Sequence, residues 1–346
     1  MEQVTLGKTG ICVNKNGFGA LPIQRISDEE AVLLLRKACD NGITFFDTAR
    51  AYTDSEHKLG LAFHDRWDDT IYVSSKTAAG TPEGFWKDLE TSLAQLQRDY
   101  LDLYQFHNPA FCPKPGDGSG LYECMLEAKK QGKIRHIGIT NHRLAVAEEA
   151  VESGLYETLQ FPFSYLSSDK DLELVDKCEK AKMGFIAMKA LSGGLINNSA
   201  AAYAYLSQFP HVLPIWGVQR EKELDEFISY VQNPPALTQE LKNVITDDRQ
   251  ELQGEFCRGC GYCMPCPAGI EINNCARMSL LIRRSPSEAQ LTSEMQEKMM
   301  QIEKCLHCGK CKSKCPYNLD TPALLERNLK DYKEILAGKA LSLIHI

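Results

Sequence analysis

Eight of the fourteen cysteines lie in two tight groups of four, and their spacing is that of metal ligands. The first group is Cys257, Cys260, Cys263 and Cys266, and the second is Cys305, Cys308, Cys311 and Cys315. A proline follows the last cysteine of each group. The second group has the spacing C-x2-C-x2-C-x3-C-P, which is typical of thiolate ligands to a [4Fe–4S] cluster. The sequence therefore predicts two [4Fe–4S] clusters bound by these eight cysteines.

The fourth ligand of each cluster is expected to be exchanged between the groups. In this spacing three cysteines hold three corners of one cluster, and the cysteine beside the proline serves the other cluster. We therefore expect Cys315 to complete the cluster of the first group and Cys266 to complete that of the second. The uncrossed arrangement stays open, because the last gap of the first group is one residue shorter than that of the second.

Zinc binding and disulfide bonding fit these cysteines less well. A structural zinc site has two C-x2-C pairs separated by a longer loop, and disulfides between cysteines three residues apart would be strained. The remaining six cysteines are expected to be small buried hydrophobic residues. They are Cys12, Cys39, Cys112, Cys124, Cys178 and Cys275.

Composition excludes two broad classes of function. The formal net charge of −7, with lysine and arginine scattered along the chain, argues against nucleic-acid binding. No run approaches the roughly 20 apolar residues that a membrane span requires. The first residues, MEQVTLGKTG, lack the order of a signal peptide, so we expect a cytoplasmic protein.

A second set of candidate residues lies where short apolar runs end. Asp47 follows the run FF, Tyr52 comes five residues later, Lys76 follows VSS, and His107 follows YQF. Each residue alone has an ordinary structural explanation. Together they place four titratable side chains at or just after the ends of three successive predicted strands, where a barrel enzyme has its catalytic face.

The elements that must position these residues alternate along the chain. β-Branched or aromatic runs are separated by charged segments of helical period, such as 28–42 and 82–97. Counting NGFGALP as the first strand gives eight strand–helix units, which predicts an α/β fold of the (β/α)8 TIM-barrel type. The opening VTLGKTGICVNK is expected to be a hairpin that closes the bottom of the barrel. The alternative is an open doubly wound sheet, for which the expected GxGxxG turn is missing.

These patterns divide the chain into four parts. We expect a barrel over residues 1–235, a connector over 236–253, a small helical iron–sulfur domain over 254–330 and a tail over 331–346. The last residues, LSLIHI, look like translated library-adapter sequence, so the native chain is expected to differ after about Ala340.

Taken together, the motifs resemble those of the aldo-keto reductase family. The matching stretches are GFGALP, FFDTARAYTDSEHKLG, VSSKT, YQFHNP and GKIRHIGITN. The last third resembles the ferredoxin-type [4Fe–4S] domain that is fused to some bacterial members. The resemblance covers nearly the whole chain.

This resemblance implies an enzyme with a definite set of catalytic residues. Tyr52 would be the general acid that protonates a carbonyl oxygen as hydride arrives from NADPH or NADH. Lys76, paired with Asp47, would lower the pKa of Tyr52, and His107 would orient the substrate oxygen. The substrate would be a small aldehyde, ketone or alcohol.

The resemblance also implies contacts to the nicotinamide cofactor. Thr140 and Asn141 would hold its carboxamide, Gln160 would lie beside its ring, and Met188 would stand where many family members stack a tyrosine. Gln160 has an alternative role as a core hydrogen-bonding residue. The other expected contacts are Gly19, Ala20, Ser192, Gly194, Leu195, Gly217 and Arg220.

The adenosine site departs from the family pattern. Trp216 replaces a proline, Glu223 stands where an arginine is common, and Phe227 replaces an asparagine. Arg220 is the cation placed to meet a 2′-phosphate. NADH is therefore a credible cofactor beside NADPH.

Two functions from different classes are compatible with these features. The first is a carbonyl reductase or alcohol dehydrogenase with an accessory iron–sulfur domain, which the complete set of four catalytic residues favours. The second is an electron-transfer or regulatory protein whose barrel holds the nicotinamide mainly as a ligand. A redox partner protein is compatible with both.

Overall fold

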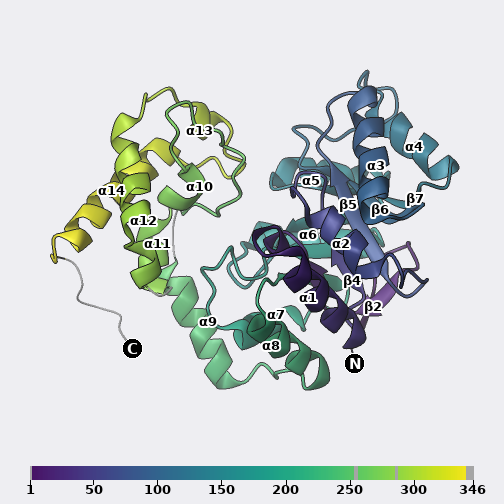
Figure 1. The fold of residues 1–346 in the computed structure, drawn as a ribbon, viewed down its shortest axis with the longest axis horizontal. Coiled ribbons are helices and arrows are strands. Elements are labelled where there is room, and N and C mark those ends of the chain that lie inside the picture. Colours follow the sequence, from purple (N-terminus) through teal and green to yellow (C-terminus); the bar gives the residue numbers. More distant parts are fainter. Residues whose placement is uncertain (1, 253–255, 285–286, 340–346) are drawn as a thin grey trace. The chain divides into compact units, whose positions relative to one another are not determined.

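In a computed structural model that describes residues 2–252, 256–284 and 287–339, the chain forms two compact units (Figure 1). Of the described residues, the first unit contains those up to 190 together with 200–241, and the second contains 191–199 together with those from 242 onward. The expected barrel boundaries therefore need one correction. Residues 191–199 follow a barrel strand in the chain, but their contacts place them in the second unit.

The first unit is a closed barrel of eight parallel strands. The strands are β3 (Gly17–Gly19), β4 (Phe45–Asp47), β5 (Tyr72–Thr77), β6 (Leu101–His107), β7 (Ile134–Thr140), β8 (Thr158–Pro162), β9 (Gly184–Met188) and β10 (Val212–Gly217). Because β10 pairs with both β9 and β3, the sheet has no free edge. The predicted TIM barrel is confirmed, and the open doubly wound sheet is wrong.

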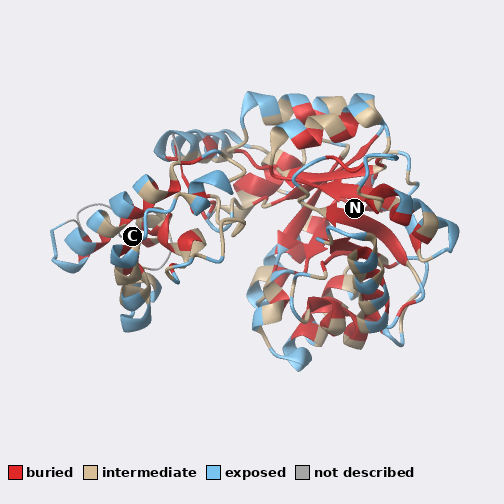
Figure 2. Ribbon diagram, turned by 90° about the horizontal axis from the view of Figure 1, so that it is seen from above, coloured by how far each residue is buried: buried red, intermediate tan, exposed pale blue. Residues whose placement is uncertain are grey.

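A helix follows each barrel strand, and the strands themselves are mostly buried (Figure 2). The helices are α1 (Asp28–Asp40), α2 (Ser55–Phe63), α3 (Pro82–Leu96), α4 (Leu121–Lys130), α5 (Leu144–Ser153), α6 (Asp169–Lys180), α7 (Ser199–Leu206) and α8 (Glu221–Gln232). Their ends follow local rules. Ser27 and Glu30 form a capping box at the start of α1, which satisfies two backbone N–H groups that the helix leaves unpaired.

The expected N-terminal hairpin is present and lies against the barrel. Strands β1 (Gln3–Thr5) and β2 (Cys12–Asn14) pair antiparallel, and Val4, Leu6 and Ile11 join one buried cluster with residues of the barrel strands. A Cβ atom on Gly7 would lie 2.4 Å from the backbone nitrogen of Gly184, the first residue of β9. Since β9 begins at Gly184, the hairpin closes the amino-terminal end of the barrel.

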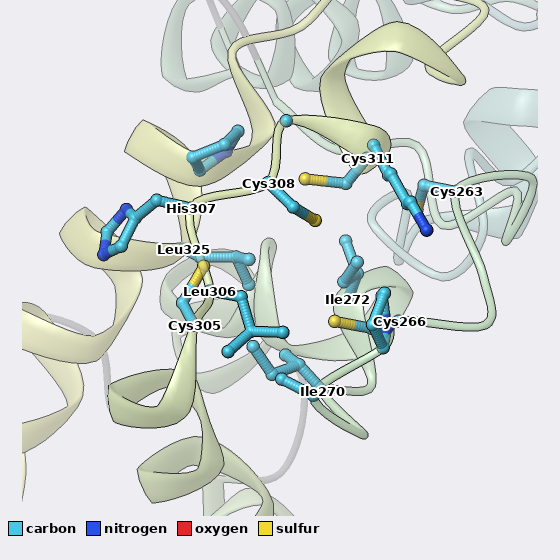
Figure 3. Close-up of a pocket in the computed structure, with 15 residues that line it drawn as sticks. Cys263, Cys266, Ile270, Ile272, Cys305, Leu306, His307, Cys308, Cys311 and Leu325 are labelled. Carbon is cyan, nitrogen blue, oxygen red and sulfur yellow. The ribbon is translucent and has the colours of Figure 1, made fainter.

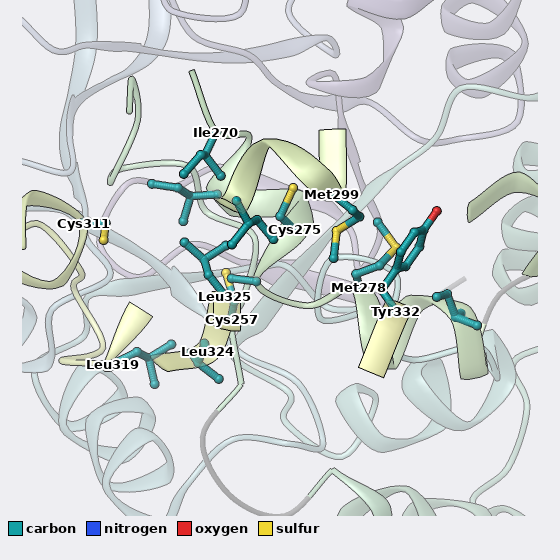
Figure 4. Close-up of a cluster of buried hydrophobic side chains, with 14 of the residues drawn as sticks. Cys257, Ile270, Cys275, Met278, Met299, Cys311, Leu319, Leu324, Leu325 and Tyr332 are labelled. Carbon is teal, nitrogen blue, oxygen red and sulfur yellow. The ribbon is translucent and has the colours of Figure 1, made fainter. Parts of the chain in front are cut away.

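The second unit is helical. Its helices are α9 (Gln239–Glu251), α10 (Ile272–Cys275), α11 (Met278–Arg284), α12 (Ser293–Met300), α13 (Lys310–Ser313) and α14 (Thr321–Leu336). A buried cluster that includes Met278, Met299, Leu325 and Tyr332 forms its core (Figure 4). Helix α14 extends into the segment that the sequence assigned to a tail, which begins at residue 331.

Two further expectations concern membrane-spanning helices and the last residues of the sequence. No helix within the described ranges is long and apolar enough to cross a membrane. The suspected adapter sequence LSLIHI lies outside the described residues.

Candidate active site and cluster-binding residues

The four candidate catalytic residues lie near the carboxyl ends of neighbouring barrel strands. Asp47 ends β4, Lys76 is the penultimate residue of β5, and His107 ends β6. Tyr52 lies in the connection between β4 and α2. Because parallel strands present their carboxyl ends at the same rim, the barrel brings these residues together, as the sequence predicts.

Lys76 and Asp47 form a buried ion pair. The Lys76 ammonium donates hydrogen bonds to Asp47 Oδ2 at 2.7 Å and to the backbone oxygen of Thr48 at 2.6 Å. The two side chains are only 1% and 2% exposed. Burial lowers the pKa of Lys76, and the negative charge of Asp47 opposes this shift. The lysine is therefore fixed in position by two short bonds.

Tyr52 lies between Lys76 and His107. The Lys76 ammonium is 5.0 Å from the centre of the Tyr52 ring, and the Tyr52 and His107 rings meet edge to face with centres 5.7 Å apart. Burial raises the pKa of Tyr52 well above its ordinary value, and the charge of Asp47 raises it further. The net shift of the Tyr52 pKa is therefore upward, and the lowering by Lys76 that the family resemblance implies stays a prediction.

His107 is a neutral ring in this environment. Burial lowers the pKa of His107 to about 3, and the positive charge of Lys76 contributes to the same shift. The imidazole therefore keeps one N–H donor and one lone-pair acceptor across the physiological pH range.

A hydrogen-bond chain extends from the ion pair across the barrel. Gln160 donates to Asp47 Oδ2 at 3.2 Å and accepts a bond of 2.7 Å from Gln105, which also donates to Ser74 at 2.8 Å. Gln160 thus has its alternative role as a core hydrogen-bonding residue. The other carboxylate oxygen of Asp47 is buried without a hydrogen-bond donor among the described residues, so it is available to a bound ligand or water.

Three residues near this site carry no signal in the sequence that marks them as functional. Gln105 belongs to the chain of amides, and Glu56 is a buried carboxylate that accepts from Ser75 and Arg50. His142 is fully buried, and burial lowers its pKa well below the ordinary value. Glu56 lies in the stretch FFDTARAYTDSEHKLG, but nothing in its spacing from Tyr52 distinguishes it from an exposed helix residue.

The expected nicotinamide contacts in the first unit also lie at strand ends. Gly19, Thr140, Met188 and Gly217 are the last residues of β3, β7, β9 and β10, and Ala20 follows Gly19. Strand register places Thr140 beside both His107 and Gln160. The predicted contacts from the barrel strands therefore gather at the same rim as the catalytic residues.

The Asn141 side chain makes more hydrogen bonds within the protein than the sequence suggests. Its amide nitrogen donates to the backbone oxygen of Pro109 at 2.9 Å, and its carbonyl accepts from the backbone N–H groups of His142 and Arg143. These bonds use its side chain mainly to shape the loop after β7.

Arg220, the predicted partner of a 2′-phosphate, is paired with an acidic residue. Its guanidinium donates to Glu223, and the Glu223 carboxylate also accepts from the backbone N–H groups of Gln219 and Arg220. Arg220 is 73% exposed, so the ion pair itself is weak. The carboxylate nevertheless adds negative charge at the start of α8.

The remaining expected cofactor residues lie in the connection 191–199 of the second unit. Ser192, Gly193 and Gly194 all have positive φ, at 49°, 67° and 91°. Arg277 donates to the backbone oxygen of Gly193 at 2.7 Å, and Arg284 donates to that of Leu195 at 2.7 Å. The helical unit that carries the cysteines therefore holds this connection in its left-handed conformation.

Arg277 also contacts the loop of the first cysteine group. A Cβ atom on Gly259 would lie 2.8 Å from the guanidinium carbon of Arg277. Gly259 has φ of 63°, and its N–H lies 3.4 Å from the sulfur of Cys257. One arginine thus joins the connection 191–199 to the first cysteine group.

Cysteines of both groups line a pocket in the second unit (Figure 3). The pocket has about 410 Å³ of space, part of it open to solvent, and its walls include apolar side chains such as Ile270, Ile272 and Leu325. Five of the eight candidate ligands line it: Cys263, Cys266, Cys305, Cys308 and Cys311. Four of these five are the cysteines that the crossed arrangement assigns to the second cluster.

The electrostatic interactions of Cys315 and Cys266 follow the same division, and Cys263 of the first group also interacts with Cys311 of the second. Burial raises the pKa of Cys257, and the nearby thiols of Cys260 and Cys315 raise it further. Burial likewise raises the pKa of Cys311, with Cys305 and Cys266 as the neighbouring thiols that contribute. Cys315 therefore lies near the first group, and Cys266 lies near the second.

The thiols around this pocket fit the ligand set of a [4Fe–4S] cluster. Among the described residues, no three cysteine, histidine or acidic side chains are arranged to hold one metal ion. A [4Fe–4S] cluster takes one thiolate at each of four separate irons, so its ligands do not converge on a common point. The pocket, the thiols around it and the few charged groups in its wall fit such a cluster.

Comparison with known proteins identifies both parts of the chain. Residues 15–201, more than half of the chain, match the profile of the Aldo/keto reductase family, and residues 256–320 match a 4Fe-4S dicluster domain. The L-galactose dehydrogenase of Arabidopsis thaliana is 28% identical over 57% of this chain and 67% of its own length. The aldo-keto reductase YhdN of Bacillus subtilis is 28% identical over 57% and 64%. The chain thus spans about two thirds of the length of these relatives.

Solved structures give the same fold for the barrel. The holo form of aldo-keto reductase AKR11C1 from Bacillus halodurans has a TM-score of 0.63 at 19% identity, over 72% of this chain and 96% of its own. A putative aldo-keto reductase from Pseudomonas aeruginosa has a TM-score of 0.59 at 22% identity, over 66% and 93%. These likenesses support the barrel fold independently of the sequence profile.

The state of His107 gives a prediction that needs no substrate. Because the folded pKa is about 3 and the unfolded value is about 6.5, only the unfolded chain takes up this proton as the pH falls. Stability from this residue is complete above pH ~6.5 and is lost toward pH ~3, by at most ~1.4 kcal/mol per pH unit. In NMR spectra the His107 ring signal should stay that of neutral imidazole between pH 8 and 5.

One variant tests this prediction, and a second variant is its control. His107→Gln should flatten the pH dependence of the free energy of unfolding, whereas His64→Gln removes an exposed ring and should leave it as in the wild type. A His107 ring that titrates near its ordinary value would contradict the buried, uncharged state.

Proposed function

The chain belongs to the aldo/keto reductase family, and we propose that it transfers hydride between NADH and a small carbonyl or alcohol compound, with two [4Fe–4S] clusters in its second unit. The observation that carries the enzymatic part is the buried Lys76–Asp47 pair, with Tyr52 beside it and His107 against the Tyr52 ring. The residues of the barrel rim fit a nicotinamide cofactor, which supplies the hydride when it is bound.

Tyr52 provides the proton for reduction of a carbonyl group. Its raised pKa means that the hydroxyl keeps its proton at every physiological pH, so the acid form is always present. A positioned acid of this kind accelerates a reaction by roughly 10²–10⁴-fold. The high pKa becomes a disadvantage only in the oxidising direction, where the phenolate must accept a proton.

His107 positions the substrate oxygen without competing as an acid. A ring with a pKa of about 3 is uncharged at neutral pH and donates one N–H. It lies edge to face with Tyr52, so an oxygen that accepts from both groups would be held in one place. Lys76 and Asp47 keep the Tyr52 ring beside His107, because Lys76 and Asp47 are themselves fixed at the ends of adjacent strands.

NADH is the favoured cofactor because of the charge at the start of α8. Glu223 pairs with Arg220, the residue that would otherwise meet a 2′-phosphate. A carboxylate at a dinucleotide site accepts hydrogen bonds from the free 2′-hydroxyl and repels a 2′-phosphate. The connection with Ser192, Gly194 and Leu195 is proposed to meet the pyrophosphate, since residues with positive φ turn successive N–H groups toward an anion.

A second candidate function is electron transfer through the clusters. The observation that favours it is the presence of two cysteine groups, because two neighbouring clusters suit stepwise electron transfer, whereas one cluster would be enough to stabilise the fold.

Methylglyoxal and L-galactose are the first substrates to try for the enzymatic proposal, because the names of two relatives refer to them.

Replacing Tyr52 tests the enzymatic proposal. Tyr52→Phe should lower kcat for reduction of methylglyoxal by roughly 10²–10⁴-fold, because the proton donor is lost. Its Kd for NADH, measured by fluorescence titration, should stay close to that of the wild type. Tyr72→Phe, at the opposite end of β5, is the matched control and should keep its activity. Full turnover by Tyr52→Phe would rule out this assignment.

Replacing Glu223 tests the choice of cofactor. Glu223→Gln should raise kcat/KM for NADPH by about tenfold, ~1.4 kcal/mol, because it removes a repelling charge and releases Arg220. The value for NADH should change much less. Glu226→Gln makes the same charge change less than one turn further along α8 and should leave the preference unaltered. A wild-type enzyme that already prefers NADPH would contradict the proposal.

Cysteine variants test the number of clusters and their ligands. Anaerobically purified protein should contain about eight irons if two [4Fe–4S] clusters are bound. Cys257→Ala and Cys315→Ala should lose one EPR signal, and Cys305→Ala and Cys266→Ala should lose the other. Cys275→Ala, which removes a buried thiol outside both groups, should keep all the iron. If Cys257→Ala and Cys266→Ala lost the same EPR signal instead, this would establish the uncrossed arrangement.

A further inference from the structure

The loop that carries the second cysteine group is strongly basic. Residues 304–319 contain four lysines and no acidic residue, although the whole chain has a formal net charge of −7. These lysines, Lys304, Lys310, Lys312 and Lys314, are all exposed. Lys312 pairs with Asp320 at 2.8 Å. A local excess of positive charge in an acidic protein indicates a surface with a specific electrostatic role.

Apolar and aromatic groups lie within the same loop. Leu306 is 66% exposed, and the His307 side chain is 69% exposed. Cys308, which follows them, lines the pocket proposed to hold the second cluster. Figure 3 shows Leu306, His307 and Cys308 together on one stretch of chain beside the pocket. The surface therefore combines an apolar contact, a rim of positive charge and a proposed cluster ligand.

We propose that this loop, residues 304–314, is the docking surface for a small acidic electron-carrier protein. The proposal rests on the cluster assignment made under the proposed function, because it needs a cluster held by Cys308. One electron crosses the contact at each encounter: the carrier is oxidised by one electron, the cluster is reduced by one, and no bond forms or breaks. The reverse transfer uses the same surface.

The composition of the loop suits such a partner better than a permanent subunit. Weak redox complexes have small interfaces, whereas obligate interfaces are large and more apolar. Here one exposed leucine is surrounded by charge. Complementary charge mainly raises the rate of association and orients the partner, which is what a carrier with rapid turnover needs.

Acidic residues border the loop without cancelling its charge. Glu303 pairs with Lys333 on α14, and Glu326 on the same helix lies 3.9 Å from His307. These carboxylates limit the basic area to the loop itself. A partner with one compact acidic patch is therefore the best match.

The test measures binding of the full-length holoprotein to a plant-type [2Fe–2S] ferredoxin, an acidic one-electron carrier. Both proteins are kept oxidised and anaerobic, and calorimetry is done at about 20 mM and 200 mM salt, where screening of exposed charges differs strongly. We expect binding at low salt that weakens at high salt. Lys304→Gln, Lys310→Gln and Lys314→Gln combined should weaken it by at least about tenfold.

A second triple variant with the same charge change is the matched control. Lys170→Gln, Lys180→Gln and Lys222→Gln replace three exposed lysines of the barrel unit and should alter the Kd by less than about twofold. Leu306→Ser should weaken binding while leaving its salt dependence unchanged. Iron content and EPR signals of every variant should match those of the wild type.

The possible results separate the docking proposal from the cluster proposal. Full iron content without ferredoxin binding, or equal losses in the two triple variants, would overturn docking and leave the clusters in place. Low iron content in the wild type would overturn both. Tighter binding to anionic lipid vesicles than to ferredoxin, lost in the first triple variant only, would assign the surface to a membrane instead.

Discussion

The barrel site depends on one buried ion pair, between Lys76 and Asp47. Removing two charges from water is costly, and breaking such a pair by deleting one partner leaves an uncompensated charge. The pair is therefore poorly explained as a device for stability alone. Its geometry explains it better: the Lys76 ammonium bonds both Asp47 and the backbone oxygen of Thr48, which fixes β4 against β5. The Tyr52 ring lies against this lysine, so the proposed proton donor is positioned by backbone register rather than by a flexible side chain.

The second unit depends on a different constraint, because its apolar core is small and includes candidate cluster ligands. Cys257 and Cys311 are members of the buried cluster, and four other candidate ligands pack against it. Small domains commonly need metal ligation to supplement their cores, and in such domains metal binding and folding are coupled. Arg277 extends this coupling to the connection 191–199, since it bonds Gly193 and contacts Gly259 in the first cysteine group. The order of a proposed cofactor loop is thereby tied to the cysteine-rich unit.

The sequence predicted the barrel well because strand ends and helix caps are local signals. The strand IRHIGIT and the positions of Asp47, Lys76 and His107 were all readable from short runs. Three features were not readable. The pKa of Tyr52 depends on burial and on the nearby charge of Asp47, which only the folded chain brings together. The buried role of Glu56 depends on contacts with Arg50 and Ser75. The membership of 191–199 in the second unit depends on two arginines more than 80 residues further along the chain.

Hydride transfer moves two electrons together, whereas an iron–sulfur cluster moves one at a time, so the activities proposed for the two units use different chemistry. The barrel residues suit the first kind, because Tyr52 keeps its proton for transfer to a substrate oxygen and His107 stays neutral. For the second unit we propose the other kind, since its two cysteine groups have the spacing of cluster ligands and exposed lysines lie beside the second group. The connection 191–199 joins two elements of the barrel, β9 and α7. Its backbone is nevertheless held by hydrogen bonds from Arg277 and Arg284 of the second unit. The proposed binding of a pyrophosphate by this connection would therefore depend on the folding of the second unit itself.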